Sequence, residues 1–217
     1  MPGDDGDETQ APADQYFTER PRSRSAPRTF RFLYRGELLT FVVDRGVFSG
    51  EGLDPGSALL IENLVLRPTD RVLDLGCGWG AVGVAAAKSA RQGRVVLTEV
   101  NRREARLAER NLERNGVRNA EVRVGSFYEP VGTETFDLIA TNPPFRAGRD
   151  HVLRILREAP EHLGPNGRLV LVGKGSQGIR FYQEWLRDHW PGPVEVLARG
   201  AGYRVLEARL ARRAPSA

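Results

Sequence analysis

Residues 71–90 read RVLDLGCGWGAVGVAAAKSA, and this segment is the strongest indication of the fold. Its first part, RVLDL, is a short apolar run typical of a buried strand, and its last part, AVGVAAAKSA, predicts a helix of small residues. Between them, Gly76, Gly78 and Gly80 allow a tight turn and a close approach of the backbone to a ligand. The start of the following helix offers free N–H groups. The stretch therefore predicts a strand, a ligand-binding loop and a helix.

The alternation of strands and helices continues toward the C-terminus. It predicts an α/β fold in which helices cover both faces of a parallel sheet. Ligands of such sheets bind beyond the carboxyl ends of the strands, where the strand order reverses. The predicted strands are 93–100, 120–125, 136–141 and 167–174, the predicted helices are 102–116, 151–163 and 179–190, and a strand pair at 194–200 and 203–210 closes the chain.

Two elements precede the glycine loop. Residues 29–46 predict a hairpin that turns at Arg35 and Gly36. Residues 54–66 predict a helix with Asp54 as N-cap and Pro55 at its first position. By these boundaries, residues 1–28 form a disordered tail that is first acidic and then arginine-rich, residues 29–213 form the domain, and residues 214–217 form a second tail. The arginine-rich stretch 20–28 fits either a solvated linker or a contact with an RNA backbone.

The composition narrows the chemistry. A chain of 217 residues suits one α/β domain. Cys77 is the only cysteine, and the three histidines are widely spaced on predicted helix surfaces, so we expect no disulfide framework, no metal site and a reducing compartment. The absence of a long apolar run predicts a cytoplasmic protein without a membrane partner. The net charge of +4 is compatible with an anionic partner.

Two acidic residues stand at predicted strand ends. Asp74 lies just ahead of the first loop glycine, and Glu99 ends the next strand. A carboxylate at the second position can accept both hydroxyl groups of a ribose, as an adenosine-containing cofactor requires. Because GCGWGA also fits the G-x-G-x-x-G/A pattern, a dinucleotide remains an alternative ligand.

The stretch ATNPPF, residues 140–145, ends another predicted strand abruptly. Proline cannot donate to a sheet ladder, and it favours extended geometry in the residue before it. The two prolines therefore hold Asn142 and Phe145 rigidly at a strand end, where a ligand is expected.

These motifs together resemble the methyltransferase small-domain family. They are DRGVFS at 44–49, LDPGS at 53–57, DLGCGWG at 74–80, NPPF at 142–145 and GYRVL at 202–206, and the resemblance spans residues 16–210. It implies a Rossmann-like class I methyltransferase fold, with a mostly parallel seven-stranded sheet and an antiparallel last strand. It also implies S-adenosylmethionine as cofactor and guanine of ribosomal RNA as substrate, with the N2 amino group favoured over N7.

The resemblance also assigns the cofactor residues. Ser126 stands where these enzymes usually carry an aspartate that binds the adenine amino group, and its hydroxyl offers only one modest hydrogen bond. We expect Phe127 to supply a stacking face for the adenine instead. The implied set is Asp74, Gly76, Cys77, Gly78, Glu99, Val100, Ser126, Phe127 and Asn142.

The family's NPPF motif implies a chemical role for Asn142, Pro143 and Phe145. In amino-group methyltransferases with this motif, the asparagine oxygen and the next carbonyl accept hydrogen bonds from a planar NH2 group, while the aromatic ring stacks on the base. An exocyclic amine is a poor nucleophile because its lone pair is delocalised into the ring. Accepting its two protons favours localisation of that pair, and we therefore expect these three residues to be catalytic.

Basic and aromatic residues flank the predicted site. Arg45 and Phe48 precede the cofactor loop, and Arg146, Arg149 and Lys174 follow strand ends. We interpret all five as contacts for substrate RNA, with an ordinary connection or solvated surface charge as the alternatives.

Three other functions remain open from the sequence. A protein glutamine side chain presents the same planar NH2 group to NPPF as a nucleobase does. A non-catalytic RNA-binding or ribosome-assembly factor would keep the fold, although Asp74, Glu99 and Asn142 argue against it. A nicotinamide oxidoreductase is disfavoured because no Tyr-Lys pair suited to hydride transfer is found.

Overall fold

The computed structural model of the protein describes residues 26–44 and 52–211. Most of the two predicted tails, and the predicted RNA contacts Arg45 and Phe48, lie outside these residues. The predicted domain boundaries thus stay predictions. Within the described ranges, no helix combines the length and the apolarity needed to cross a membrane.

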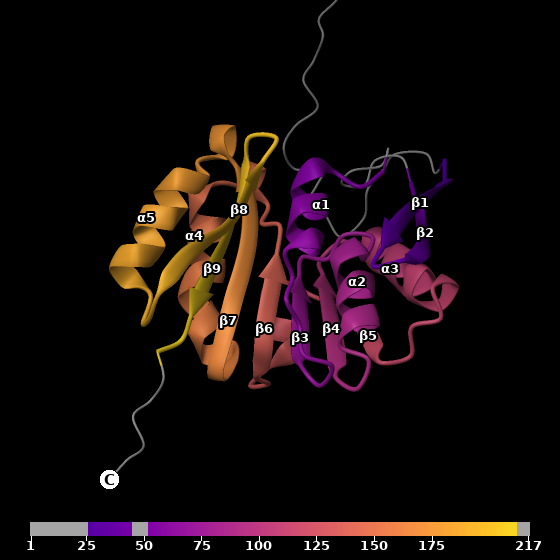
Figure 1. Cartoon of the computed structure of the whole chain (residues 1–217), viewed down its shortest axis with the longest axis horizontal. Helices are drawn as coiled ribbons and strands as arrows, with labels where there is room; N and C mark the ends of the chain where they lie inside the picture. Colours follow the sequence, from indigo (N-terminus) through magenta and orange to yellow (C-terminus); the bar gives the residue numbers. More distant parts are fainter. Residues whose placement is uncertain (1–25, 45–51, 212–217) are drawn as a thin grey trace, which may run out of the picture.

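A seven-stranded sheet forms the centre of the fold (Figure 1), in the order β5-β4-β3-β6-β7-β9-β8. β9 pairs antiparallel with both neighbours, and the other pairings are parallel, as predicted. The chain winds outward from β3 to β5 and then returns to β6, so the strand order reverses between β3 and β6. The strands are β3 Arg71–Leu75, β4 Arg94–Glu99, β5 Ala120–Val124, β6 Phe136–Thr141, β7 Leu163–Lys174, β8 Val194–Gly200 and β9 Tyr203–Arg209.

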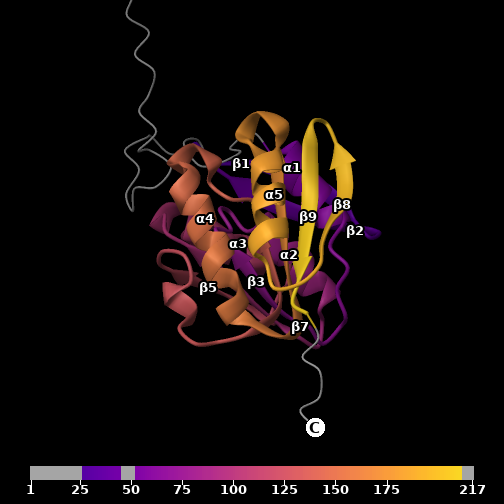
Figure 2. The ribbon, with the colours of Figure 1, turned by 90° about the vertical axis from the view of Figure 1, so that its left-hand side faces the viewer.

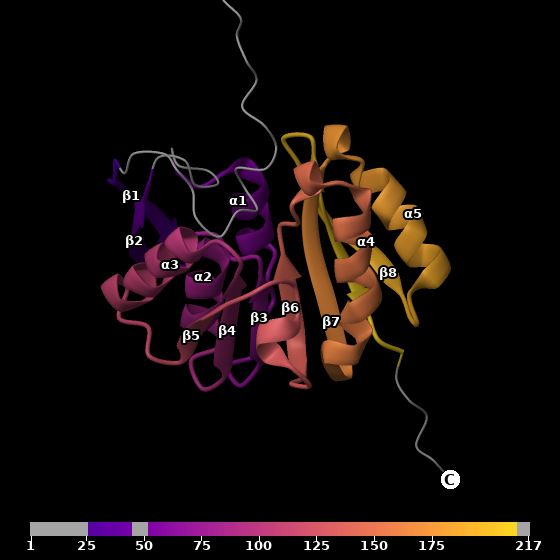
Figure 3. The same cartoon turned by 180° about the vertical axis from the view of Figure 1, so that it is seen from behind.

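Helices cover both faces of this sheet. The helices α1 Pro55–Glu62, α2 Ala81–Ser89 and α3 Arg102–Arg114 share one apolar core. On the other face, α4 Arg149–Glu158 and α5 Ile179–His189 lie side by side in a second core (Figures 2 and 3). Successive strand residues alternate between the cores, since Val72 belongs to the first and Leu73 to the second. This burial on both sides explains the continuous apolar runs of the parallel strands.

Several predicted boundaries shift. The helix predicted at 54–66 ends at Glu62, and two other shifts have local reasons. The helix predicted at 151–163 ends at Glu158 and continues as a 3-10 turn over Ala159–His162. Pro160 has no N–H group for an α-helical hydrogen bond. β7 begins at Leu163 rather than after the Gly-Pro-Asn-Gly turn, because the strand pairing with Phe136 already starts there.

The predicted hairpin forms a separate two-stranded sheet from β1 Arg28–Tyr34 and β2 Glu37–Val43. It is attached to α3 by asparagine side chains one helical turn apart. Asn111 accepts from Val42 N (2.8 Å) and donates to the carbonyl oxygens of Val42 (2.9 Å) and Trp79 (2.8 Å). Asn115 makes the equivalent pair of bonds with Thr40 at 2.9 Å each. Through Trp79, Asn111 thereby connects the hairpin to the glycine loop.

We expect Asn111→Ala to lower the free energy of unfolding by about 2–4 kcal/mol, because it leaves three backbone groups without their partner. Denaturant titration measures this change. The matched control is Asn63→Ala, which removes one side-chain hydrogen bond to the Leu59 carbonyl and should cost less than about 1 kcal/mol. Equal losses in the two variants would contradict a bridging role for Asn111.

Candidate active site

A cavity of about 530 Å³ lies where the strand order reverses. Its size falls within the usual range for small-ligand sites. The carboxyl ends of β3, β4 and β6 contribute Asp74, Glu99 and Asn142 to its wall. The start of α1 and the loop after β5 close the remaining sides, through Ser57 and Phe127.

The glycine loop after β3 is held against β4 by its backbone. The N–H groups of Gly76 and Cys77 both donate to the carbonyl oxygen of Thr98, at 3.0 Å each. Gly76, Gly78 and Gly80 have φ values of +72°, +56° and +90°, which residues other than glycine rarely adopt. The tight turn predicted for these glycines is therefore confirmed, because the backbone is left-handed at all three as the loop leads into α2.

Asp74 is buried beneath this loop, with an exposed fraction of 2%. Its carboxylate accepts the N–H of Gly83, in the first turn of α2, at 2.7 Å. Burial, together with a smaller contribution from the nearby Glu99 carboxylate, raises the pKa of Asp74 to about 7. One hydrogen bond does not compensate for the lost hydration, so this carboxyl group favours a cationic neighbour.

Glu99 fixes the loop from the opposite side. Its two carboxylate oxygens accept from the N–H groups of Gly78 and Asn101, each at 2.9 Å. Burial raises the pKa of Glu99 as well. Glu104, from the first turn of α3, is 4% exposed and also lines the cavity. Three buried acidic side chains therefore surround one end of the cavity.

Phe127 and Ser126 line the cavity beyond the end of β5. Phe127 adopts a left-handed φ of +49°, so the chain turns sharply at this residue. Its ring stacks on His151, with centroids 5.8 Å apart, and the guanidinium of Arg154 lies 4.1 Å from its centroid. His151 itself lines the cavity. The prediction that the histidines occupy helix surfaces holds for His151, which is exposed on α4, but it is wrong for His162, which is buried against Tyr128.

Asn142 immediately follows β6, and its side chain contacts the start of α1. Its Nδ2 donates to Ser57 Oγ at 3.1 Å and to Asp54 Oδ1 at 3.5 Å. Thr141 Oγ1 donates to the Leu75 carbonyl at 2.8 Å, which ties the end of β6 to the end of β3. The position of Asn142 relative to the glycine loop is therefore set by both backbone pairing and side-chain contacts.

The rest of NPPF forms a compact turn. The N–H of Phe145 donates to the Pro143 carbonyl at 2.8 Å. The Phe145 ring packs on Gly173 of β7, where an added Cβ would lie 2.5 Å from Phe145 Cζ, and its centroid is 5.6 Å from that of Tyr182. The aromatic residue is thus fixed by packing while still lining the cavity.

Comparison with known proteins agrees with this arrangement. The sequence model of the methyltransferase small domain matches residues 38–207, which include every element that lines the cavity. The chain belongs to the methyltransferase small domain family. Its seven-stranded sheet and its antiparallel β9 are those of a Rossmann-like methyltransferase.

The chain is similar to a relative of about its own length and to longer proteins. The chain is 33% identical over 199 residues to the uncharacterized protein YbxB of Bacillus subtilis, covering 91% of this chain and 98% of that protein. It is 36% identical to the ribosomal RNA small subunit methyltransferase C of Serratia proteamaculans, covering 77% of this chain and 48% of that protein. The chain thus spans about half of the length of the longer relative.

A solved member of the family gives a direct comparison. The Thermus thermophilus 16S rRNA N2 G1207 methyltransferase, in complex with AdoMet and guanosine, superimposes with a TM-score of 0.75 at 31% identity. The match covers 88% of this chain and 52% of that one.

The structure brings most of the residues expected from the family resemblance into one cavity. Of the substrate residues, Arg146 lines the cavity, whereas Arg149 and Lys174 do not. Arg149 instead lies over the Phe181 ring, 4.4 Å from its centroid. The expected residues that line the cavity are Asp74, Gly76, Cys77, Gly78, Glu99, Val100, Ser126, Phe127, Asn142, Pro143, Phe145 and Arg146.

Sequence reasoning missed several residues of this methyltransferase site. From the sequence, Glu104 is one of several acidic residues in an amphipathic helix, and Asp54 is predicted only as a helix N-cap. Tyr203, which also lines the cavity, was noticed only within the GYRVL motif. The spacing of Asp54 and Ser57 in LDPGS was the one local signal that could have pointed to the site.

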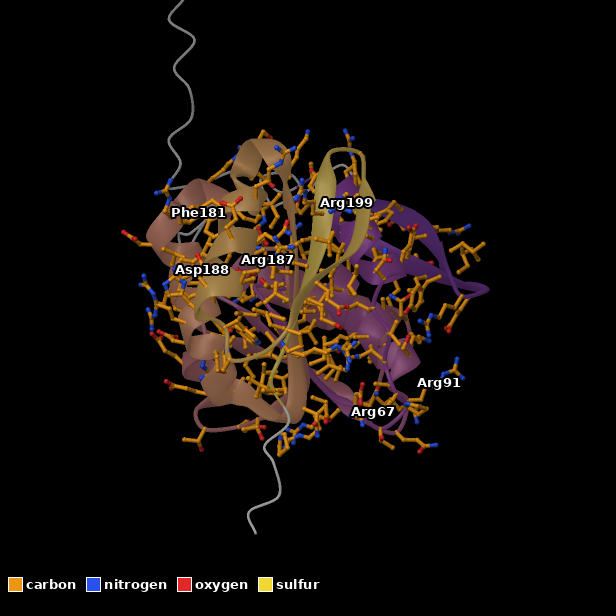
Figure 4. All side chains as sticks on the ribbon, turned by 60° about the vertical axis from the view of Figure 1, so that its left-hand side comes forward. Arg67, Arg91, Phe181, Arg187, Asp188 and Arg199 are labelled. Carbon is orange, nitrogen blue, oxygen red and sulfur yellow. The ribbon has the colours of Figure 1, made fainter. Side chains whose placement is uncertain are left out.

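Arginines are not confined to the cavity end of the molecule. Figure 4 shows Arg199 and Phe181 toward the end where the parallel strands finish, and Arg67 and Arg91 at the opposite end. Arg67 forms an ion pair with Asp70 there, with 2.6 Å between Nε and Oδ1. Part of the basic excess therefore serves ion pairs that have no connection with the cavity.

Proposed function

We propose that this protein is an S-adenosylmethionine-dependent methyltransferase that modifies the N2 amino group of a guanine in ribosomal RNA. One observation carries the proposal: Asn142 and the acid-lined glycine loop face a single cavity. A donor and an acceptor of a methyl group can therefore meet there. Family membership and the ribosomal RNA methyltransferases among the relatives support the same conclusion.

The residues at the glycine loop fit this cofactor. S-adenosylmethionine carries an electrophilic methyl group on a positively charged sulfur, and transfer breaks the carbon–sulfur bond to leave a neutral thioether. The buried acids Asp74, Glu99 and Glu104 favour a cationic ligand. Glu99 would accept the ribose hydroxyls, and Phe127 would offer its ring to the adenine. Left-handed glycines let the backbone approach the ligand without a Cβ in between.

The residues at the end of β6 suit an amino-group acceptor. Asn142 is held at the cavity wall, where its Oδ1 can accept a hydrogen bond from a planar NH2 group. The Pro143 carbonyl retains a second lone pair beside its bond to Phe145 N. These acceptors localise the nitrogen lone pair, which forms the new nitrogen–carbon bond, and the surplus proton passes to water. Phe145 would stack on the base.

An RNA substrate requires the target base to leave its stack, at a cost of a few kcal/mol. Stacking on Phe145 and contacts between arginine and phosphate would offset that cost. Arg146, Arg149 and Lys174 are exposed near the ends of β6 and β7, where such phosphates would lie. We propose that Arg149 and Lys174, which do not line the cavity, contact phosphates of the RNA backbone outside it.

A methyl-transfer assay with labelled S-adenosylmethionine tests the proposal. Ribosomal RNA, ribosomal subunits, transfer RNA and ribosomal proteins are offered separately, and labelled RNA is digested to nucleosides for mass spectrometry. N2-methylguanosine is the expected product. N7-methylguanosine would overturn the assigned atom, whereas label confined to protein would overturn the RNA substrate and favour glutamine methylation.

The raised pKa of Asp74 predicts a pH-dependent cofactor affinity. A cationic ligand requires the ionised carboxylate, whereas the free protein holds the proton up to about pH 7. The affinity for S-adenosylmethionine should therefore fall by up to about tenfold for each pH unit below 7 and level off above it. Calorimetric titration measures the trend. Asp74→Asn should bind weakly with a flatter profile, and an equally steep profile in that variant would assign the titration to another group.

A further inference from the structure

Two side chains at the start of α1 hold the amide of Asn142 in one orientation. Ser57 Oγ and Asp54 Oδ1 both lie on the Nδ2 side of this amide, at 3.1 and 3.5 Å. They come from positions 85 and 88 residues earlier in the chain. Neither contact is needed to place the β6 backbone, which is already paired with β3 and β7.

Asp54 decides which way the amide points. A carboxylate oxygen only accepts hydrogen bonds, so it can face the NH2 of Asn142 but not its carbonyl oxygen. The same Oδ1 atom accepts the N–H groups of Gly56 and Ser57 at 3.0 Å each, because Asp54 caps α1. Capping of α1 therefore fixes the position of Asp54 Oδ1, and this oxygen in turn fixes the orientation of the Asn142 side-chain amide.

The start of α1 is itself immobilised against the sheet. Gly56 leaves room for the ring of Tyr203 in β9, since an added Cβ would lie 2.7 Å from Tyr203 Cε1. Pro55 stands at the first helical position. The cap thus has little freedom to move away from Asn142.

This orientation leaves the carbonyl oxygen for the ligand. Within the described part of the chain, the hydrogen bonds of the Asn142 side chain all use Nδ2, and the residue lines the cavity. A carbonyl oxygen accepts from an amino group but cannot bond to a ring nitrogen such as N7 of guanine, which is also an acceptor. The opposite amide orientation would reverse this preference.

We propose that Asp54 and Ser57 are positioning residues that make the cavity selective for an N–H donor, by holding the Asn142 carbonyl toward the acceptor base. The proposal rests on the proposed methyl transfer to an amino group, and it adds the device that selects this group. Removing Ser57 Oγ takes away the closer of the two partners while the α1 cap, which uses the Ser57 backbone, stays intact.

The orientation can be tested without any RNA. In 15N-labelled protein, we expect the Asn142 side-chain NH2 signals, assigned by their loss in Asn142→Ala, to exchange slowly with solvent. Ser57→Ala should accelerate this exchange at least several-fold. The matched control is Ser89→Ala, which removes a serine hydroxyl bonded to Tyr34 at 2.8 Å and should leave the Asn142 signals unchanged.

Methyl-transfer rates then test whether the orientation of the Asn142 amide contributes to catalysis. Ser57→Ala should lower kcat about 10- to 100-fold at unchanged affinity for S-adenosylhomocysteine, whereas Ser89→Ala should retain wild-type activity. In an Asn142→Ala background, Ser57→Ala should cause no further loss, because it acts through Asn142. The wild-type protein should also bind RNA with guanine at the target position more tightly than RNA with hypoxanthine, which lacks the amino group, and Ser57→Ala should reduce this difference.

The outcomes separate the two proposals. Fast Asn142 exchange in the wild type would overturn the positioning role of both residues even if the enzyme methylates RNA, and full kcat in Ser57→Ala would overturn that of Ser57. Slow exchange that depends on Ser57, in a protein that methylates no RNA, would support the fixed orientation and overturn the proposed substrate. A further loss on the Asn142→Ala background would assign Ser57 a role other than positioning Asn142.

Discussion

Replacing Asn142 by alanine should reduce methyl transfer by at least about a thousandfold while leaving the cofactor affinity within about twofold of wild type. The amide oxygen interacts with the acceptor amine as charge develops on its nitrogen, so its loss should appear in kcat. The glycine loop and its acids contact other parts of the cavity and should be undisturbed. Labelled methyl transfer to the RNA identified in the substrate assay measures the rate, and calorimetry with S-adenosylhomocysteine measures the affinity.

Asn63→Ala is the matched control for this truncation. Asn63 follows α1 and bonds to the Leu59 carbonyl at 2.8 Å, outside the residues that line the cavity. Its removal should leave kcat within about twofold of wild type. A parallel loss of cofactor affinity and thermal stability in Asn142→Ala would contradict a catalytic role and indicate a folding role for the asparagine.

Replacing Asp74 by asparagine should weaken S-adenosylmethionine binding about 100-fold, or about 2.7 kcal/mol, and yet stabilise the free protein. Asparagine keeps an oxygen for the Gly83 N–H, which Asp74 accepts at 2.7 Å, but it carries no charge. The cost of the buried carboxylate disappears together with its attraction for the cationic ligand. Binding and stability should therefore change in opposite directions.

The sign of the stability effect follows from linkage. Burial raises the pKa of folded Asp74 to about 7, whereas an aspartate in an unfolded chain titrates near 4. The folded state holds the proton more tightly, so this group's contribution to stability is largest below about pH 4, declines as the pH rises, and is lost above about pH 7. At about pH 8, Asp74→Asn should thus raise the free energy of unfolding by on the order of 2 kcal/mol.

Denaturant titrations and calorimetry on the same samples check both halves of this expectation. Asp74→Ala provides the comparison, because it removes the acceptor of the Gly83 N–H as well as the charge. It should bind the cofactor as weakly as Asp74→Asn, but it should be less stable than that variant by about 1–3 kcal/mol. Wild-type affinity in Asp74→Asn would show that the cofactor does not use the charge at this position.

Features that depend only on neighbouring residues can be predicted from the amino-acid sequence. The strands are apolar runs, the left-handed positions of the loop after β3 are glycines, and Asp54 caps α1 because its side chain reaches N–H groups two and three residues ahead. The same local patterns placed Asp74, Glu99 and Asn142 at strand ends. Parallel strands bring their carboxyl ends to one edge of a sheet, so a shared site could be expected from the strand pattern.

Contacts between side chains across the packed layers depend on the folded arrangement of the whole domain. Asp54 orients Asn142 because the start of α1 contacts the residue that follows β6, and no local pattern encodes a contact between residues 88 positions apart. Glu104 reaches the cavity, and Asn111 joins the hairpin to the glycine loop, because of how α3 sits against the sheet. Arg149, which we expect to contact substrate RNA, lies over the Phe181 ring outside the cavity for the same reason. Local rules fix the backbone of an element, whereas the rotation and position of each helix on the sheet follow from the filling of two apolar cores by residues from the whole domain.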